Sequence, residues 1–353
     1  MNTISAVSKN FFIASNIALG LMSVLIAEQA FACATCGCSL NSDAAMGYTS
    51  ATGWQASLQL DYINQNQLRT GTSAVSTTSV AALNDSGGSQ EVEKQTINRY
   101  FTLGIAYTLD HDWSFRLQIP FIDRSHSTYG NVGVADLNSA NVSGSDVNSL
   151  GDIKFVTNWQ GLLPTHNLGI QFGVKLPTGN YGGQQASGPI VGHHPVSVNS
   201  GPSVGSLLDT SLQAGTGSTD LILGAFYLQP ISQNFDAYIN AQLQAAWIHN
   251  LDQAGSDFRP GNQQTVNFGL RYAENPNFMP QIQINLTHKN ADQGALADIY
   301  ASGTTAHLSP GFSATVVEGL QAFAFLQVPI YSNLQGYQLF PHWTASVGIS
   351  HHF

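Results

Sequence analysis

The three cysteines of this 353-residue chain lie within six residues of one another, at Cys33, Cys36 and Cys38. Thiolates at such close spacing select soft ions such as Cu(I) or Zn²⁺. One interpretation is therefore a metal site that uses all three thiolates, with His351 and His352 as candidates to complete it. The sequence indicates no other cofactor.

Other interpretations of the thiols stay open. Three cysteines in an oxidising compartment cannot all pair within one chain, which leaves a local disulfide with one spare thiol or a bridge to a periplasmic partner protein. A lipid anchor on Cys33 is a further interpretation, although Ala30 is unfavourable three residues before an acylated cysteine. Haem attachment is disfavoured because Gly37 and not histidine follows Cys36. An iron–sulfur cluster would need a fourth thiolate.

A second set of polar residues could set the selectivity of a pore. Each falls on the polar parity of a segment in which polar and apolar residues alternate. The pore-lining candidates are Asp61, Arg116, Gln118, Asp152, Lys154, Lys175, Asp220, Arg271 and Gln327, with Asp236 as a further charge. In a pore such groups select solutes by field and size. In the alternative interpretation they pair across strands and fill the interior.

These residues need strands to position them, and the sequence predicts about twelve. In residues 54–62 every second residue is apolar, from Trp54 to Tyr62, and the others are Gln55, Ser57, Gln59 and Asp61. Similar segments of roughly the ten-residue length of transmembrane strands follow. They are residues 101–107, 115–121, 151–159, 168–176, 221–227, 237–247, 266–272, 281–287, 308–316, 321–331 and 337–353.

The connections between these segments alternate in length. Short turns are expected near residues 110–112, 164–167, 232–234, 274–277 and 318–319. Long polar stretches lie between them, at residues 70–92, 130–148, 182–215, 251–263 and 292–306. Short periplasmic turns and long external loops are typical of outer-membrane barrels. Residues 182–215 are long enough either to fold into the lumen as a constriction or to form a mobile external loop.

Composition favours the same architecture. Only 9% of the residues are charged, against roughly 25% in soluble domains. Lys and Arg number 11 and Asp and Glu 21, and a net charge of −10 without basic runs argues against nucleic acid as a partner. A soluble β-sandwich would instead show a charged solvent face. We therefore expect an all-β transmembrane antiparallel β-barrel in contact with outer-membrane lipid, with interface aromatics at segment ends.

The N-terminal residues predict export. Lys9 precedes an apolar run at residues 11–27, and Ala30-Phe31-Ala32 forms a small-x-small cleavage site. The expected organisation is a signal peptide at residues 1–32, a periplasmic cysteine-containing segment at 33–52 and one barrel domain at 53–353. The expected location is the outer membrane of a Gram-negative bacterium.

Three predicted ascending segments end in proline, at Pro120, Pro177 and Pro329. Because proline cannot donate to a strand ladder, each should mark a bulge or the end of pairing. The shared phase places Gln118, Lys175 and Gln327 in the lumen, and it directs Phe323 and Phe325 inward as well.

Three motifs carry a resemblance to a known family. They are Ser-Leu-Gly-Asp-Ile at residues 149–153, Lys-Leu-Pro-Thr-Gly-Asn-Tyr at 175–181 and Gly-Thr-Gly-Ser-Thr-Asp-Leu at 215–221. The chain resembles, over residues 53–353, the outer-membrane barrel "transporter" family of the MetA pathway of phenol degradation. Some members carry a Cys-Gly-Cys near the mature N-terminus, like residues 36–38 here. The resemblance implies a barrel and a transport role, without a settled substrate.

The function expected from these features is an outer-membrane channel for small solutes or ions. The alternative is a structural or docking barrel whose cysteine-rich N-terminus binds metal or a periplasmic redox or efflux partner. We expect no enzyme, because the sequence has no Gly-x-Ser-x-Gly or comparable constellation, and His126 beside Ser127 is too weak a signal.

The chain ends in the aromatic residue Phe353, which we interpret as a signal to the barrel-assembly machinery. Deletion of Phe353 should deplete the protein from the outer membrane, because the closing strand would no longer be recognised for insertion. Membrane fractionation measures this, and normal insertion without Phe353 would contradict the architecture.

Overall fold

The computed structural model describes residues 52–185, 188–298 and 300–353. The predicted signal peptide and the three cysteines lie outside the described residues. Among the described residues, no helix is long and apolar enough to cross a membrane.

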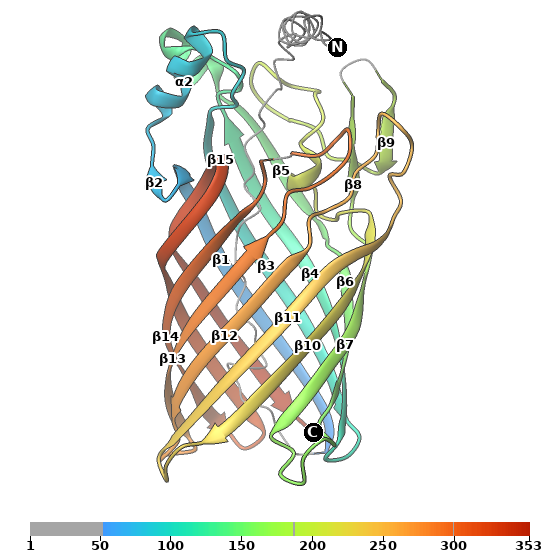
Figure 1. Ribbon diagram of the computed structural model, residues 1–353, viewed down its shortest axis with the longest axis vertical. Helices are drawn as coiled ribbons and strands as arrows, with labels where there is room; N and C mark the ends of the chain where they lie inside the picture. The colour runs from blue at the N-terminus through green and yellow to red at the C-terminus, as the bar shows by residue number, and fades with distance from the viewer. Residues whose placement is uncertain (1–51, 186–187, 299) are drawn as a thin grey trace, which may run out of the picture.

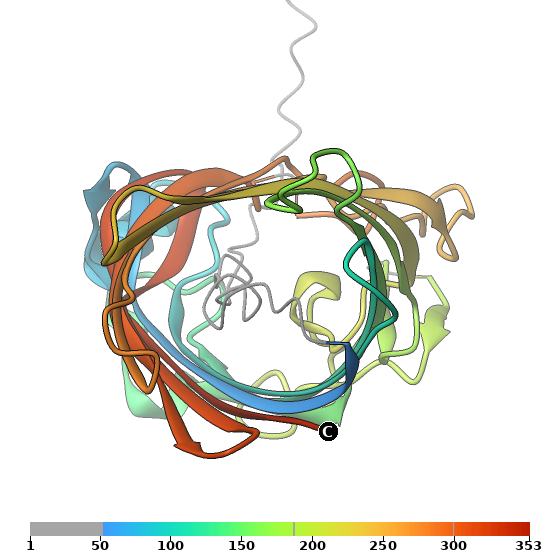
Figure 2. The same cartoon turned by 90° about the horizontal axis from the view of Figure 1, so that it is seen from below.

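One antiparallel sheet closes into a barrel (Figures 1 and 2). Closure follows from β15, which pairs with β14 on one side and with β1 on the other. The wall consists of β1 (Gly53–Gly71), β3 (Glu93–Thr108), β4 (Trp113–Thr128), β5 (Ser143–Leu150), β6 (Ile153–Trp159), β7 (Leu168–Leu176), β10 (Ser218–Pro230), β11 (Phe235–His249), β12 (Gln263–Tyr272), β13 (Phe278–Lys289), β14 (Gly303–Val317) and β15 (Leu320–His352).

Strand β15 makes two passes through the wall. Its first arm pairs with β14 as far as Leu334, and its second arm pairs with β1 from Gln338 to His352. Between the arms Gly336 has φ +62°, a conformation that suits glycine in a tight turn. Strands β5 and β6 both pair with β4 and together make one pass. Counted in this way, the described part of the chain makes twelve passes, as the sequence predicts.

The end of the chain lies beside the first strand. The Trp54 N–H donates to the Phe353 carbonyl at 3.0 Å, and the Phe353 N–H donates to the Trp54 carbonyl at 2.9 Å. The predicted pairing of the last strand with the strand that begins near Gly53 is confirmed.

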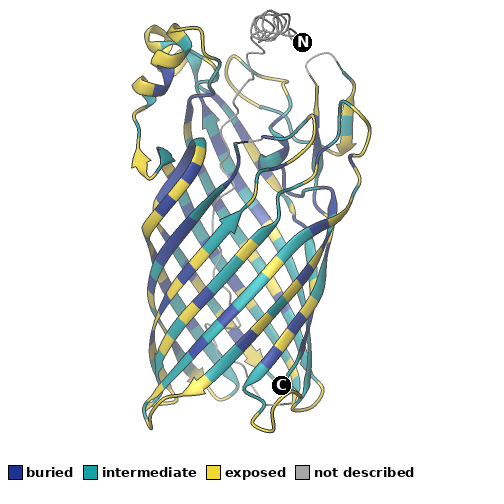
Figure 3. Ribbon diagram, in the orientation of Figure 1, coloured by how far each residue is buried: buried dark blue, intermediate teal, exposed yellow. Residues whose placement is uncertain are grey.

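Burial in this barrel is inverted relative to a soluble protein (Figure 3). Large apolar side chains such as Leu223, Ile284 and Val347 point outward and are exposed. Amide and hydroxyl side chains such as Gln171 and Gln283 are buried inside the barrel. An apolar exterior suits lipid, and the closed ladder satisfies the backbone groups that lipid could not. The alternation predicted from the sequence is therefore confirmed.

The prolines lie where pairing is irregular. Pro120 is inside β4, opposite the gap between β5 and β6, where the Gly151 N–H donates to its carbonyl at 2.8 Å. Pro329 pairs with His307, next to a register shift in β14. Strand β7 ends at Leu176, directly before Pro177. These positions confirm the interpretation that each proline interrupts the ladder.

The long connections contain more structure than the sequence predicts. Strand β1 continues to Gly71, and the stretch expected to be a polar loop holds β2 (Ser73–Ala74) and helix α2 (Thr77–Asp85). The Ser79 N–H donates to the Ser76 Oγ at 3.0 Å and caps α2. Shorter elements are η1 (Val134–Asp136), η2 (Ser139–Asn141), β8 (Tyr181–Gln184), β9 (Ile190–His193) and η3 (Thr210–Leu212). The expected loop at 130–148 is shorter because β5 begins at Ser143.

Inward aromatic rings pack over glycines on the neighbouring strand. Phe226 lies opposite Gly169, and Tyr238 lies opposite Gly269. A Cβ on Gly269 would approach the Tyr238 ring to 2.0 Å, so only glycine leaves room for the ring. Phe323 and Phe325 are also buried, as predicted.

Substitution Gly269→Val should therefore destabilise the barrel by about 1–3 kcal/mol, the usual cost of overpacking. Urea unfolding in lipid vesicles, followed by tryptophan fluorescence, measures the change. The matched control is Ala241→Val on the outer face of β11, which should leave the midpoint nearly unchanged. Equal midpoints for both variants would contradict the packing described here.

Candidate functional site

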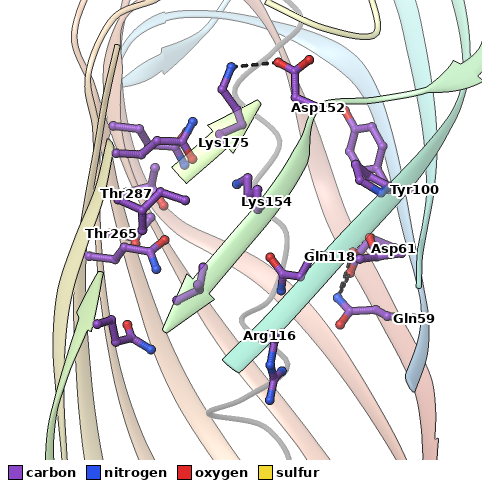
Figure 4. Close-up of a pocket in the computed structure, with 18 of the residues that line it drawn as sticks. Gln59, Asp61, Tyr100, Arg116, Gln118, Asp152, Lys154, Lys175, Thr265 and Thr287 are labelled. Carbon is purple, nitrogen blue, oxygen red and sulfur yellow. Dashed lines mark hydrogen bonds and ion pairs between the residues drawn. The ribbon is translucent and has the colours of Figure 1, made fainter. Parts of the chain in front are cut away.

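A cavity of about 350 Å³ lies inside the barrel, near the middle of the strands (Figure 4). One side of it, formed by β1, β3, β4, β6, β7 and β10, carries charged, amide and apolar groups. The opposite side, formed by β11, β12 and β13, carries only amide and hydroxyl groups. These uncharged groups are Gln242, Gln244, Gln263, Thr265, Asn267, Asn285 and Thr287.

The structure brings six of the nine predicted pore residues to this cavity. They are Asp61, Arg116, Gln118, Asp152, Lys154 and Lys175. Asp220 lies directly behind the lining, bound to Lys175. Gln327 is buried between Asn285 and Ser346. Arg271 forms an ion pair with Asp236 at 2.8 Å, away from the cavity. The role of these residues in a pore remains a prediction.

Lys175 is the centre of a buried ion cluster. Its Nζ lies 2.8 Å from an Asp152 oxygen and 3.2 Å from an Asp220 oxygen, and all three side chains are less than 10% exposed. Asp152 also accepts the Gly179 N–H at 3.1 Å and the Thr216 N–H at 3.0 Å. These donors distribute the two negative charges, which a single ammonium group cannot neutralise alone.

The three sequence motifs described above meet at this cluster. Asp152 comes from the first motif, Lys175 and Gly179 from the second, and Thr216 and Asp220 from the third. A Cβ on Gly179 would lie 2.9 Å from the Gly215 backbone, so the second and third motifs touch through glycine. The three motifs therefore supply the residues of one buried polar cluster on the inner wall of the barrel.

A second polar group surrounds Asp61 on β1. The Gln59 amide donates to both Asp61 oxygens at 2.9 Å, and the Ser346 hydroxyl donates at 2.5 Å. Gln59 and Asp61 face the cavity from β1, on the other side of Gln118 from Lys154 (Figure 4). Lys154 lies opposite both Gln118 and Lys175 in the strand register. The lining thus separates a carboxylate on β1 from an ammonium group on β6.

Residues 196–214, which we call the inner loop, fold against the inside of the wall. Leu208, Leu212 and Ala214 are buried against Ile122 and Val147. Viewed along the barrel, part of this yellow-green segment lies inside the ring of strands (Figure 2). The partly buried Tyr100 packs on the same cluster, and Tyr100 and Ile122 also line the cavity. The second half of residues 182–215 therefore folds inward, as one of the two expectations for that stretch has it, and whether it constricts the lumen stays a prediction.

Arg124, which is not among the residues predicted from the sequence, holds the inner loop in place. Its Nη1 donates to the Leu212 carbonyl and, at 3.4 Å, to the Gln213 carbonyl. Its Nη2 donates to the Tyr100 hydroxyl at 3.0 Å. The alternation of the strand does place Arg124 inward, because it lies six residues after the inward Gln118. The predicted segment ended at residue 121, however, while β4 continues to Thr128.

The inner loop is also tied to itself. The Gln213 amide donates to the carbonyls of Val196 and Leu208 and accepts the Val196 N–H, at 2.8–3.0 Å.

Among the residues that the structure describes, no group of three His, Cys, Asp or Glu side chains is arranged to hold a metal ion. His351 Nδ1 lies 3.1 Å from the Gly319 carbonyl oxygen, to which it can only donate, at the end of the barrel where the chain finishes. The proposed ligands Cys33, Cys36 and Cys38 are not described.

Comparison with solved structures identifies the fold. An outer-membrane channel from Pseudomonas putida F1 aligns with 89% of this chain and 100% of its own, with 12% identity and a TM-score of 0.60. Two other solved structures are less similar. The translocator domain of the autotransporter NalP from Neisseria meningitidis has 9% identity and a TM-score of 0.47. A deletion mutant of the P. putida monoaromatic hydrocarbon channel TodX has 11% identity and a TM-score of 0.46. They cover 88% of this chain, and 92% and 98% of their own.

At 12% identity the first likeness establishes the fold, and the two less similar structures carry no argument. The resemblance to outer-membrane transporter barrels is thereby confirmed at the level of the fold. No family model and no curated protein sequence matches the chain.

Substitution Lys175→Met should destabilise the barrel by about 3–5 kcal/mol, because it leaves two buried carboxylates without their cation. Urea unfolding in vesicles measures this. Arg99→Met is the control, since the Arg99–Asp123 pair is about one third exposed and such pairs are worth about 1 kcal/mol or less. Adding Asp152→Asn and Asp220→Asn to Lys175→Met should recover part of the loss. An unchanged urea midpoint for Lys175→Met would contradict the claim that this cluster stabilises the barrel.

Proposed function

We propose that this chain, a barrel with the fold of an outer-membrane channel, conducts small polar solutes or ions through its lumen. The observation that carries the proposal is the polar cavity of about 350 Å³ inside a closed wall whose exterior is apolar. An apolar exterior holds the barrel in lipid, while amide, hydroxyl and charged groups inside can replace the water that surrounds a polar solute.

The size of the lumen supports small solutes. Barrels of about eight strands are filled by their side chains, whereas 16 to 18 strands leave an aqueous channel. A wall of twelve passes lies between these cases. Its cavity is at the lower end of the range for small-molecule sites. The uncharged side of the cavity offers hydrogen bonds without fixing a charge, which favours passage over tight binding.

The charged lining is the proposed selectivity region. Asp61 faces the lumen from β1, and Arg116 and Lys154 face it from β4 and β6. Charges of opposite sign on neighbouring strands along one side of a narrow lumen set up a field beside the path of the solute. We assign the pore role to these residues, together with Gln118, Asp152 and Lys175.

The barrel is proposed to reside in the outer membrane, inserted through recognition of Phe353. The work we assign to it is transport and not catalysis. The inner loop is proposed to restrict the route, because it packs on Tyr100 and Ile122, two residues of the cavity lining.

Planar-bilayer recording of the purified full-length protein tests the channel. Wild type should show small or infrequent openings, and Arg124→Met should raise the mean current several-fold, because it removes the side-chain donors that hold the Leu212 and Gln213 carbonyls. Replacing residues 196–213 by a short Gly/Ser linker should raise it further. Arg99→Met, an outward arginine on the adjacent strand, is the control and should behave as wild type.

Absence of ion-sized openings in wild type, in Arg124→Met and in the linker variant would refute the channel. An unheated sample of each variant must migrate as a folded barrel in gel electrophoresis for its recordings to count.

A further inference from the structure

Four carboxyl groups gather at the long-loop end of the barrel, around the start of η3. Glu91 and Glu93 come from the segment that enters β3, Asp209 from the inner loop and Asp298 from the connection between β13 and β14. Glu91, Glu93 and Asp298 are buried, and Asp209 is half-buried. The charges of Asp209 and Asp298 both act on Glu91 and Glu93, which places the four groups within electrostatic reach of one another.

The cluster has few donors. Glu93 Oε2 accepts the Leu339 N–H at 3.3 Å, and one Asp298 oxygen accepts the Tyr300 N–H at 2.9 Å. The other oxygen of each group, Glu93 Oε1 and Asp298 Oδ2, is buried and has no hydrogen-bond partner among the described residues. A buried ionised oxygen without a donor is costly, whereas a protonated carboxyl group is not.

Cations near the cluster are already engaged. The cation that acts on Asp298 is Lys289, whose Nζ lies 3.0 Å from Asp292. Asp292 itself adds a further negative charge next to Asp298. The Thr128 hydroxyl is the side-chain donor at Glu91. Ionisation of the four groups would therefore bring like charges together, one of them on the inner loop.

The acid–base properties follow from this placement. Burial, followed by the charge of Asp209, raises the pKa of Glu91 to about 8. Burial raises the pKa of Asp298 to about 7 and that of Asp209 to about 6. Because these carboxyl groups bind protons more tightly in the packed arrangement than in water, that arrangement is favoured at low pH. It loses stability as the pH rises above the ordinary carboxyl pKa of about 4, and the loss is complete near pH 8, the raised pKa of Glu91.

We propose that this cluster is a proton-controlled latch on the inner loop, which rests in the lumen while the carboxyl groups are protonated and is released when they ionise. The proposal rests on the channel function proposed above. Asp209 is the moving member, because it belongs to the inner loop and immediately precedes η3. Glu91 and Asp298 belong to other connections and Glu93 is the first residue of β3; together they form the surface from which Asp209 is repelled. Arg124 holds the other end of η3 through the Leu212 carbonyl and resists release.

Bilayer recording at pH 5, 7 and 9 tests the latch in the full-length protein. Mean current should be low at pH 5 and rise at least about tenfold by pH 9, since one unit of pKa shift corresponds to a tenfold change in an equilibrium. Asp209→Asn, and separately Glu91→Gln with Asp298→Asn, should keep the current low at pH 9, because these variants cannot develop the repulsion. Glu318→Gln, an exposed carboxyl at the opposite end of the barrel, is the control and should keep the wild-type pH response.

The outcomes separate the latch from the channel. A current that does not change with pH in wild type, while Arg124→Met conducts, would overturn the latch and leave the channel intact. A pH response that survives in both sets of acid variants would also overturn it. Failure of every variant to conduct at any pH would remove the channel itself. A current that follows added Ca²⁺ and its chelator at constant pH, and not the proton concentration, would replace the proton with a cation and refute the proposal.

Discussion

The structure depends on one constraint, which is that lipid offers no hydrogen bonds to a polypeptide backbone. Only a sheet that closes on itself satisfies every strand under that condition. Here closure depends on β15, whose second arm returns to β1 and brings Phe353 beside Trp54. The inverted burial follows directly. Apolar side chains face lipid, and the polar side chains of the same strands must find their partners inside the barrel.

The interior solves this second problem with networks of different character. Uncharged amides and hydroxyls form the side of the cavity made by β11 to β13. Around Lys175, two carboxylates and one ammonium group are joined by backbone donors from Gly179 and Thr216. Aromatic rings over glycines, such as Phe226 over Gly169, fill other parts of the lumen with apolar surface. The side chains that stabilise the interior and the side chains that would line a solute path therefore occupy the same inward positions of the strands.

Much of the barrel could be predicted from the sequence because the period of two is visible locally. Parity placed Asp61 and Lys154 inside, and the shared phase of the proline-ending segments placed Gln327 there. The prolines also marked real irregularities such as the gap opposite Pro120. Parity could not show where the connections fold. Helix α2 lies in a stretch whose composition resembled a loop, and the inner loop is positioned by Arg124 across 88 residues of sequence. The grouping of Glu91 with Asp209 and Asp298 is likewise a tertiary fact, since no local pattern links them.

The central claim is that solutes cross through the polar lumen and that the inner loop narrows it. The most direct test is swelling of proteoliposomes that contain the purified protein, in uncharged solutes of increasing size. Swelling should fall steeply as the solute volume approaches the cavity volume of about 350 Å³, and the size limit should be higher when residues 196–213 are replaced by a linker. Proteoliposomes that swell no faster than protein-free vesicles in every solute, with and without the inner loop, would contradict it.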